Sequence, residues 1–195
     1  MVAANFTQVD EKWRSFRPRR KWYRTLVSRS AVALILKEGR DGLETLMIRR
    51  AEREGDPWSG HMAFPGGRAE PEDQTILHTA RRETFEEIGL DTDRYTRCQG
   101  ALSDVLSPPR RGRKPMVITP YLFTMEESPE LEINYEVAEV VWIPLNFLAD
   151  HSNRAQIQWP RLLGPTNLPC YYYNERQIWG LSLAMLDELM AVLKV

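Results

Sequence analysis

The segment Arg82–Leu90 constrains this chain more than any other, because it reads as a helix with three glutamates in five residues. At about 100° per residue, Glu83, Glu86 and Glu87 share one face of that helix. Like charges at these spacings destabilise an isolated helix by roughly 0.2–0.5 kcal/mol per pair. A bound cation that neutralises the three carboxylates is therefore the simplest explanation for the cluster.

Turn residues and apolar runs predict the elements around this helix. Pro65-Gly66-Gly67 requires a turn before it, since proline fixes φ and glycine frees it. The helix is expected to begin at 71–73, with Asp73 as its N-cap, and to end at Gly89. Strands are expected at 31–36, 43–49, 62–64, 97–102, 117–125 and 140–143, and a second amphipathic helix at 176–194. Strands mixed with two long helices indicate an α/β fold with a sheet between helices.

Length and charge set the scale of the molecule. A chain of 195 residues suits one domain, expected at 29–195, preceded by a basic and aromatic arm or helix at 1–28. The net charge of −1 gives no general attraction to nucleic acid or membranes. No apolar run of about 18 residues and no signal-like segment is visible. Cys98 and Cys170 form no metal-type spacing, and a reducing cytoplasm is the expected compartment.

The acidic segment resembles the signature of the Nudix hydrolases, G-x5-E-x7-R-E-U-x-E-E-x-G-U, in which U is a bulky aliphatic residue. Five fixed positions of its second half match at the right spacing: Arg82, Glu83, Glu86, Glu87 and Gly89. Thr84 departs from the aliphatic position. The first half is offset, because Gly67 lies one residue too far from Arg82 and Asp73 is the nearest stand-in for the first glutamate. A one-residue insertion in the loop explains the offset.

The resemblance extends to the coenzyme A diphosphatase branch of that family. Gly60–Gly67, with the sequence GHMAFPGG, looks like the G-x3-F-P-G-G segment of that branch. Further segments are similar at 79–80, 134–137, 141–145 and 178–181, so that the resemblance covers roughly residues 30–190. The branch usually has an arginine four residues before the first glycine. Asp56 occupies that position here, and the nearest arginine is Arg53.

The resemblance implies an α/β/α sandwich with a mixed sheet and a hydrolase that uses Mg²⁺ or Mn²⁺. Carboxylate oxygens bind such hard cations, which also bridge to substrate phosphates. Glu83, Glu86 and Glu87 would be the metal ligands, with the Gly67 carbonyl as a weaker candidate. Arg82 would orient a glutamate through a paired hydrogen bond. The general base would be Glu136, with Glu139 as the alternative.

The most similar activity is cleavage of the diphosphate of coenzyme A, or of a derivative, to 3′,5′-ADP and phosphopantetheine. The basic residues Arg110, Arg111, Arg113 and Lys114 would then meet the 3′-phosphate. ADP-ribose, a dinucleotide or a nucleoside triphosphate remain alternative substrates. An RNA 5′-end pyrophosphohydrolase and a nucleotide sensor without catalysis are further alternatives. The expected partner is a small nucleotide, and Tyr171–Tyr173 are assigned to packing or to a homodimer contact.

Overall fold

A mixed sheet forms the centre of the computed structural model, which describes residues 5–55, 58–109, 114–159 and 164–194. Within these residues eight strands join in the order β3-β2-β1-β7-β5, with β4 on β1, β6 on β7 and β8 on β2. Their bounds are β1 Ser28–Gly39, β2 Gly42–Arg50, β3 Met62–Ala63, β4 Gly66–Arg68, β5 Arg97–Ala101, β6 Val105–Ser107, β7 Met116–Met125 and β8 Val137–Pro144. The long pair β1–β7 is parallel and the other pairs are antiparallel, as a mixed sheet requires.

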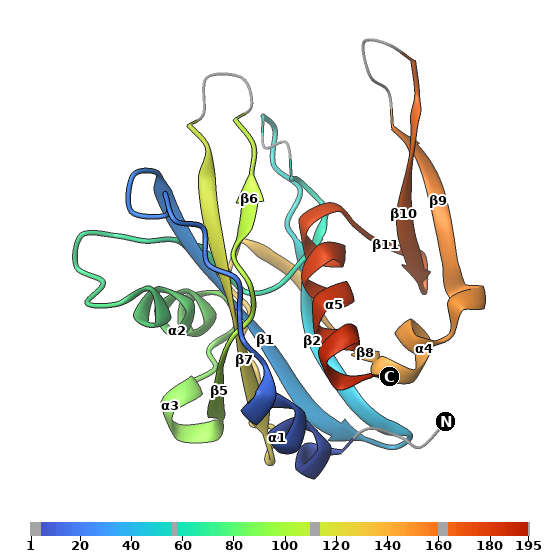
Figure 1. Ribbon diagram of the computed structural model, residues 1–195, viewed down its shortest axis with the longest axis horizontal. Coiled ribbons are helices and arrows are strands. Elements are labelled where there is room, and N and C mark those ends of the chain that lie inside the picture. The colour runs from blue at the N-terminus through green and yellow to red at the C-terminus, as the bar shows by residue number, and fades with distance from the viewer. Residues whose placement is uncertain (1–4, 56–57, 110–113, 160–163, 195) are drawn as a thin grey trace.

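Helices cover both faces of this sheet (Figure 1). On one face of the sheet, helix α2, Ile76–Ile88, packs Ile88 with Ala33 and Ile35 of β1 and packs Ala80 with Ala31. Helix α5, Gly180–Leu193, packs on the other face. Because β-strand side chains alternate between faces, each strand contributes to both cores. The expected α/β/α sandwich is therefore confirmed.

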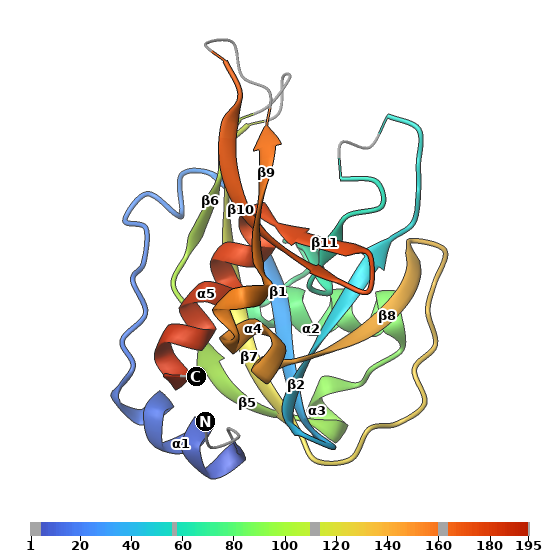
Figure 2. The ribbon, with the colours of Figure 1, turned by 90° about the vertical axis from the view of Figure 1, so that its right-hand side faces the viewer.

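A smaller antiparallel sheet stands beside α5 (Figure 2). It consists of β9 Arg154–Trp159, β10 Thr166–Tyr173 and β11 Arg176–Trp179, and it follows the short helices α4, Leu145–Ala149, and η1, His151–Asn153. The prediction of a helix over 176–194 is wrong in its first turn, because 176–179 pair with β10. The helix begins at Gly180, whose φ of +64° lets the chain change direction after the strand.

The N-terminal segment packs against the domain. Helix α1, Phe6–Ser15, buries Val9 completely in the core under α5. The chain then runs beside β6 (Figures 1 and 2), where the Asp104 amide donates to the Arg19 carbonyl at 2.9 Å. The division at residues 28 and 29 stays a prediction. In the described part of the chain, no helix combines the length and the apolar character needed to cross a membrane.

Candidate active site

The glycine turn touches the acidic helix through main-chain atoms. The Gly66 amide donates to Glu87 Oε2 at 2.8 Å, and Ser30 Oγ donates to the Gly67 carbonyl at 2.5 Å. Gly66 has a φ of +148°, and a side chain there would collide with the backbone of β1. A side chain at Gly67 would collide with the carboxylate of Glu83. Gly66 is required by this close approach to β1, whereas a side chain at Gly67 would displace only the flexible end of Glu83.

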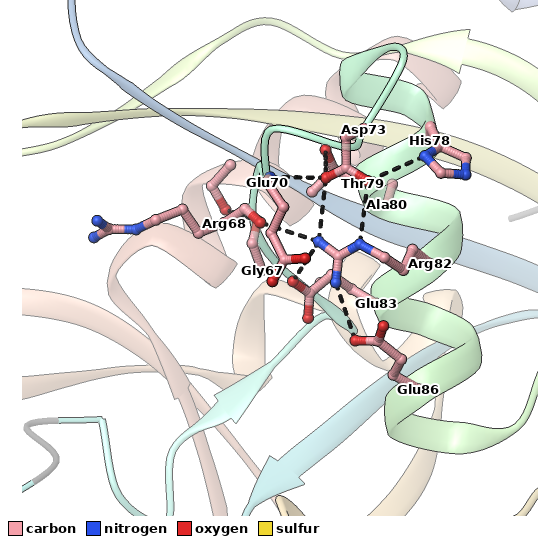
Figure 3. A network of polar contacts seen from close by, with 12 residues as sticks. Gly67, Arg68, Glu70, Asp73, His78, Thr79, Ala80, Arg82, Glu83 and Glu86 are labelled. Atoms are coloured by element: carbon pink, nitrogen blue, oxygen red, sulfur yellow. Dashed lines mark hydrogen bonds and ion pairs between the residues drawn. The ribbon is translucent and has the colours of Figure 1, made fainter.

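Asp73 holds Arg82 from the loop before the helix (Figure 3). Its side chain is 1% exposed, and its carboxylate accepts from Arg82 Nε at 3.1 Å and Nη2 at 3.2 Å. Thr79 Oγ1 and the Glu70 amide also donate to it. These hydrogen bonds, led by those of Arg82, hold the pKa of Asp73 well below its usual range.

The expectation that Asp73 caps the helix is wrong. Thr75 is the N-cap and accepts from the His78 amide, so the helix begins at Ile76. Asp73 instead forms an ion pair with Arg82, which was not predicted from the sequence. Its carboxylate lies inside the site and not at the helix end.

Arg82 in turn connects two of the three glutamates (Figure 3). Its Nη2 donates to Glu83 Oε1 at 3.0 Å and its Nη1 to Glu86 Oε2 at 3.0 Å. The Glu83 side chain is largely buried, whereas that of Glu86 is half exposed. Burial raises the pKa of Glu83 in spite of Arg82.

Glu87 is the most deeply buried of the three glutamates. It is 2% exposed and lies under the helix, where the Gly66 amide contacts it. Burial, followed by the charge of Glu83, raises the pKa of Glu87 to about 8, although Gly66 and Arg50 act in the opposite direction. The three carboxylates thus range from buried to exposed along one edge of the helix.

Glu136 lies beside this edge, because its loop is tied to the end of the helix. The Asn134 amide donates to the Glu87 carbonyl at 3.0 Å and the Glu132 amide to the Ile88 carbonyl at 3.1 Å. The charge of Glu136 contributes to the raised pKa of Glu87. Arg53 holds the Glu136 carboxylate at 3.1 Å.

Glu139, the alternative base, belongs to a different group. Arg176 contacts both of its oxygens, at 2.8 and 2.6 Å, and lowers the pKa of Glu139. It lines a polar cavity of about 360 Å³ that contains none of the acidic helix. The cavity residues are Arg49, Gly60, His61, Met62, Glu139, Asn174, Glu175, Arg176, Gln177 and Trp179. The structure therefore brings Glu136, and not Glu139, to the acidic helix.

Comparison with known proteins identifies the family from the sequence around this site. The NUDIX domain profile matches residues 27–161, more than half of the chain. The chain belongs to the Nudix family. Residues 82–90, which carry the resemblance to the Nudix signature, lie within the matched range, as does Asp73.

Curated relatives include proteins of known and unknown activity. A Schizosaccharomyces pombe protein named uncharacterized protein C14C4.10c is 35% identical over 62% of this chain and 38% of its own length. The mitochondrial coenzyme A diphosphatase NUDT8 of Homo sapiens is 30% identical over 76% of this chain and 62% of its own length. The chain therefore spans less than two thirds of these relatives. The name of the second relative describes a diphosphatase, the class of enzyme that the sequence resemblance led us to expect.

Solved structures support the Nudix fold at low sequence identity. A MutT/nudix family protein from Enterococcus faecalis matches with a TM-score of 0.56 at 18% identity, over 98% of this chain and 70% of that one. A C. elegans Ap4A hydrolase binary complex matches with a TM-score of 0.52 at 18% identity, over 63% and 83% of the two chains. At such identity the likeness concerns the fold alone.

The donors at this Nudix site suit a hard divalent cation in kind. They are carboxylate oxygens and the Gly67 carbonyl, which are the ligand types that such cations prefer, and the buried Glu87 carboxylate lies against the glycine turn, where the Gly66 amide donates to it. Among the described residues, no three His, Cys, Asp or Glu side chains already converge as a metal cage. Arg82 bonds to one oxygen each of Glu83 and Glu86, Oε1 and Oε2, so the other oxygen of each carboxylate is the candidate ligand of a cation.

Sequence reasoning did not assign Ser30, Arg50 or Arg53 to the site. Ser30 fixes the Gly67 carbonyl, Arg50 offsets the charge of Glu87, and Arg53 pairs with Glu136. Arg53 had a sequence signal, since it is the arginine nearest to the position that Asp56 occupies. Asp56 and the basic residues 110–113 lie outside the described residues.

Proposed function

We propose that this chain hydrolyses the diphosphate linkage of a small nucleoside-containing molecule with Mg²⁺ or Mn²⁺. The observation that carries the proposal is the position of the Glu83 and Glu87 carboxylates against the glycine turn, where a side chain at Gly67 would meet Glu83 and the Gly66 amide donates to Glu87. A diphosphate is itself an anion, so this acidic site needs a cation between it and the substrate.

Each residue has a defined part in the proposed reaction. Glu83, Glu86 and Glu87, together with the Gly67 carbonyl, would hold the cation, which would supply charge neutralisation of the diphosphate and a lowered pKa for the attacking water. Glu136 accepts a proton from that water, and Arg53 fixes the Glu136 carboxylate. Asp73 positions Arg82, which keeps the side chains of Glu83 and Glu86 in reach.

Coenzyme A or a derivative is the substrate that we favour. The Gly60–Gly67 segment and the likeness to a mitochondrial coenzyme A diphosphatase support it. Water would cleave one P–O bond of the diphosphate, giving 3′,5′-ADP and phosphopantetheine. ADP-ribose, dinucleotides and nucleoside triphosphates are the second candidates, because Asp56 replaces the arginine expected in the coenzyme A branch.

The other functions considered have less support. An RNA 5′-end substrate fits poorly with a net charge of −1. A sensor without catalysis does not explain why all of Glu83, Glu86 and Glu87 are present. A cytoplasmic location and a homodimer stay predictions, and one relative carries a mitochondrial name. Of the tyrosines assigned to a contact, Tyr171 is buried within the chain and Tyr172 is exposed.

A substrate panel tests the proposal. The chain is incubated with coenzyme A, its 3′-dephospho form, ADP-ribose, a dinucleotide and a nucleoside triphosphate, with Mg²⁺, Mn²⁺ or a chelator, and products are identified by mass spectrometry. We expect turnover of coenzyme A that the chelator abolishes. If ADP-ribose is cleaved while coenzyme A stays intact, the assignment of coenzyme A as the substrate is overturned. If no compound is cleaved under any condition, the proposed hydrolase activity is overturned.

The variant Glu87→Gln tests the acidic site itself. Glutamine keeps an oxygen for the Gly66 amide but lacks the charge, so we expect kcat to fall roughly 100-fold or more with the fold retained. Glu38→Gln, on the exposed side of β1, is the matched control and should leave kcat unchanged. Normal turnover in Glu87→Gln would remove Glu87 from the ligand set.

A further inference from the structure

Three arginines gather around one buried carboxylate at the start of β1, away from the acidic cluster. Arg20 Nη1 contacts Asp104 Oδ1 at 3.2 Å, and Arg24 Nη1 lies 3.5 Å from Asp104 Oδ2. Arg29 is the third: it lies on the same face of β1 as Ala31, whose register partner on β7 is Thr119, a hydrogen-bond donor to Asp104. Tyr121 lies on that face of β7 two residues after Thr119, and the charges of the three arginines act on its hydroxyl group.

Asp104 has no capacity left for Arg29. Its two oxygens already accept from Arg20, from the Lys21 amide at 3.0 Å and from Thr119 Oγ1 at 2.9 Å, and they pair with Arg24. A carboxylate offers about four acceptor positions, and these contacts use them. The cluster therefore has three guanidinium groups and one carboxylate, which gives it an excess of positive charge.

Arg29 carries the clearest sign of a missing anion. Its Nε and Nη2 atoms are shielded from solvent, and neither has a hydrogen-bond partner among the described residues. These two atoms form the edge of a guanidinium that binds carboxylate or phosphate with two parallel bonds. Arg82 uses the same two atoms on Asp73. Unpaired charged donors of this kind are costly, and burial and Arg24 lower the pKa of Arg29.

The arginine cluster and the proposed active site are connected through consecutive residues of β1. The Arg29 carbonyl accepts from the Ala69 amide at 3.0 Å, and the next residue, Ser30, holds the Gly67 carbonyl. Arg20 and Arg24 are its partly exposed members, with side chains 33% and 24% exposed. They come from the N-terminal segment, so this segment supplies two of the three cations.

We propose that Arg20, Arg24 and Arg29, with the Tyr121 hydroxyl, form a binding site for a phosphate group. A phosphomonoester dianion matches the excess charge and presents several acceptor oxygens to the Nε–Nη2 edge of Arg29. It enters between the exposed Arg20 and Arg24. The phosphate comes either from the substrate, as a group remote from the bond that is cleaved, or from free phosphate in solution. Only the first source rests on the proposed function.

Titration of the full chain with inorganic phosphate tests the site without any turnover. Binding is measured by calorimetry, with and without Mg²⁺, for the wild type, Arg29→Gln and the exposed hairpin control Arg40→Gln. We expect Arg29→Gln to bind phosphate at least about tenfold more weakly, and Arg40→Gln to match the wild type. Equal binding by Arg29→Gln and the wild type, or no binding by the wild type, would overturn the proposal.

Thermal melts separate a phosphate site from a purely structural arginine. Without phosphate, Arg29→Gln should melt no lower than the wild type, because one of three crowded like charges is removed. Added phosphate should raise the melting temperature of the wild type and not that of the variant. A lower melting temperature with an unchanged phosphate response would contradict the site. If Arg29→Gln does not fold, Arg24→Gln is measured in the same way and its phosphate response tests the site.

The source of the phosphate follows from kinetics. If the site holds the 3′-phosphate of the substrate, Arg29→Gln should raise KM for coenzyme A and leave KM for the 3′-dephospho form unchanged. An unchanged KM ratio together with lost phosphate binding assigns the site to free phosphate. If the chain cleaves none of the panel, the titration still decides the phosphate site, so the two proposals fail separately.

Discussion

Asp73 stabilises the candidate active site as a single residue. Its buried carboxylate is bonded to Arg82, Thr79 and the Glu70 amide. We expect Asp73→Asn to lower the free energy of unfolding by about 2 kcal/mol near neutral pH, because Arg82 loses its charged partner. Chemical denaturation of the two proteins measures this difference, and the exposed neighbour Glu72→Gln is the control.

The same substitution has a defined pH dependence. Because Arg82 lowers the pKa of Asp73, the stabilisation is complete above the ordinary value of 3.8 and is lost as the pH falls through the lowered pKa. The difference between wild type and Asp73→Asn should therefore be constant at neutral pH and shrink in acid. A difference that stays the same down to strongly acidic pH would refute the charged pairing.

At the scale of elements, the contact between β4 and β1 depends on a missing side chain. Gly66 has a positive φ and would direct a methyl group into the backbone of β1. We expect Gly66→Ala to destabilise the protein by at least about 2 kcal/mol, measured by denaturation. Gly55, with a φ of +80° and open space around it, is the matched control, and Gly55→Ala should cost about 1 kcal/mol. Equal losses would mean that conformation alone matters at Gly66.

Local sequence signals predicted most elements and missed those that depend on distant partners. The six expected strands and the end of α2 at Gly89 are present. Ile178 fits a helical pattern. It lies in β11 instead, where it pairs with Tyr171 of β10, because a second sheet is available. The strands β9 and β10 were not predicted, since their half-exposed residues show no apolar run.

The site shows the same division between local and distant information. The spacing of the three glutamates indicated one helix edge, and the helix supplies it. The burial of Glu87 depends on how α2 rests on the sheet, which no local pattern contains. The link from Arg53 to Glu136 spans 83 residues, and that from Ser30 to Gly67 spans 37. Such pairs follow from the sheet register and not from either segment alone.

At the scale of the whole molecule, the N-terminal segment is part of the core. Val9 is fully buried beneath α5, far along the chain from its neighbours there. We expect Val9→Ala to lower the free energy of unfolding by about 2 kcal/mol, through lost apolar contact and a small cavity. Thr7→Ala, on the exposed side of the same helix, should change it by less than about 0.5 kcal/mol. Equal small effects would show α1 to be dispensable for folding.

Two main-chain hydrogen bonds join the loop before β8 to the end of α2. Backbone amides occur at nearly every residue, so these two bonds do not depend on the side chains at 132 and 134, although the Asn134 side chain also accepts from the Glu136 amide. Insertion or deletion of a residue between Asn134 and Glu136 alters the spacing between Glu136 and the acidic helix at once. The number of residues in this short stretch is therefore more tightly constrained than the exposed side chains of Ile133 and Tyr135.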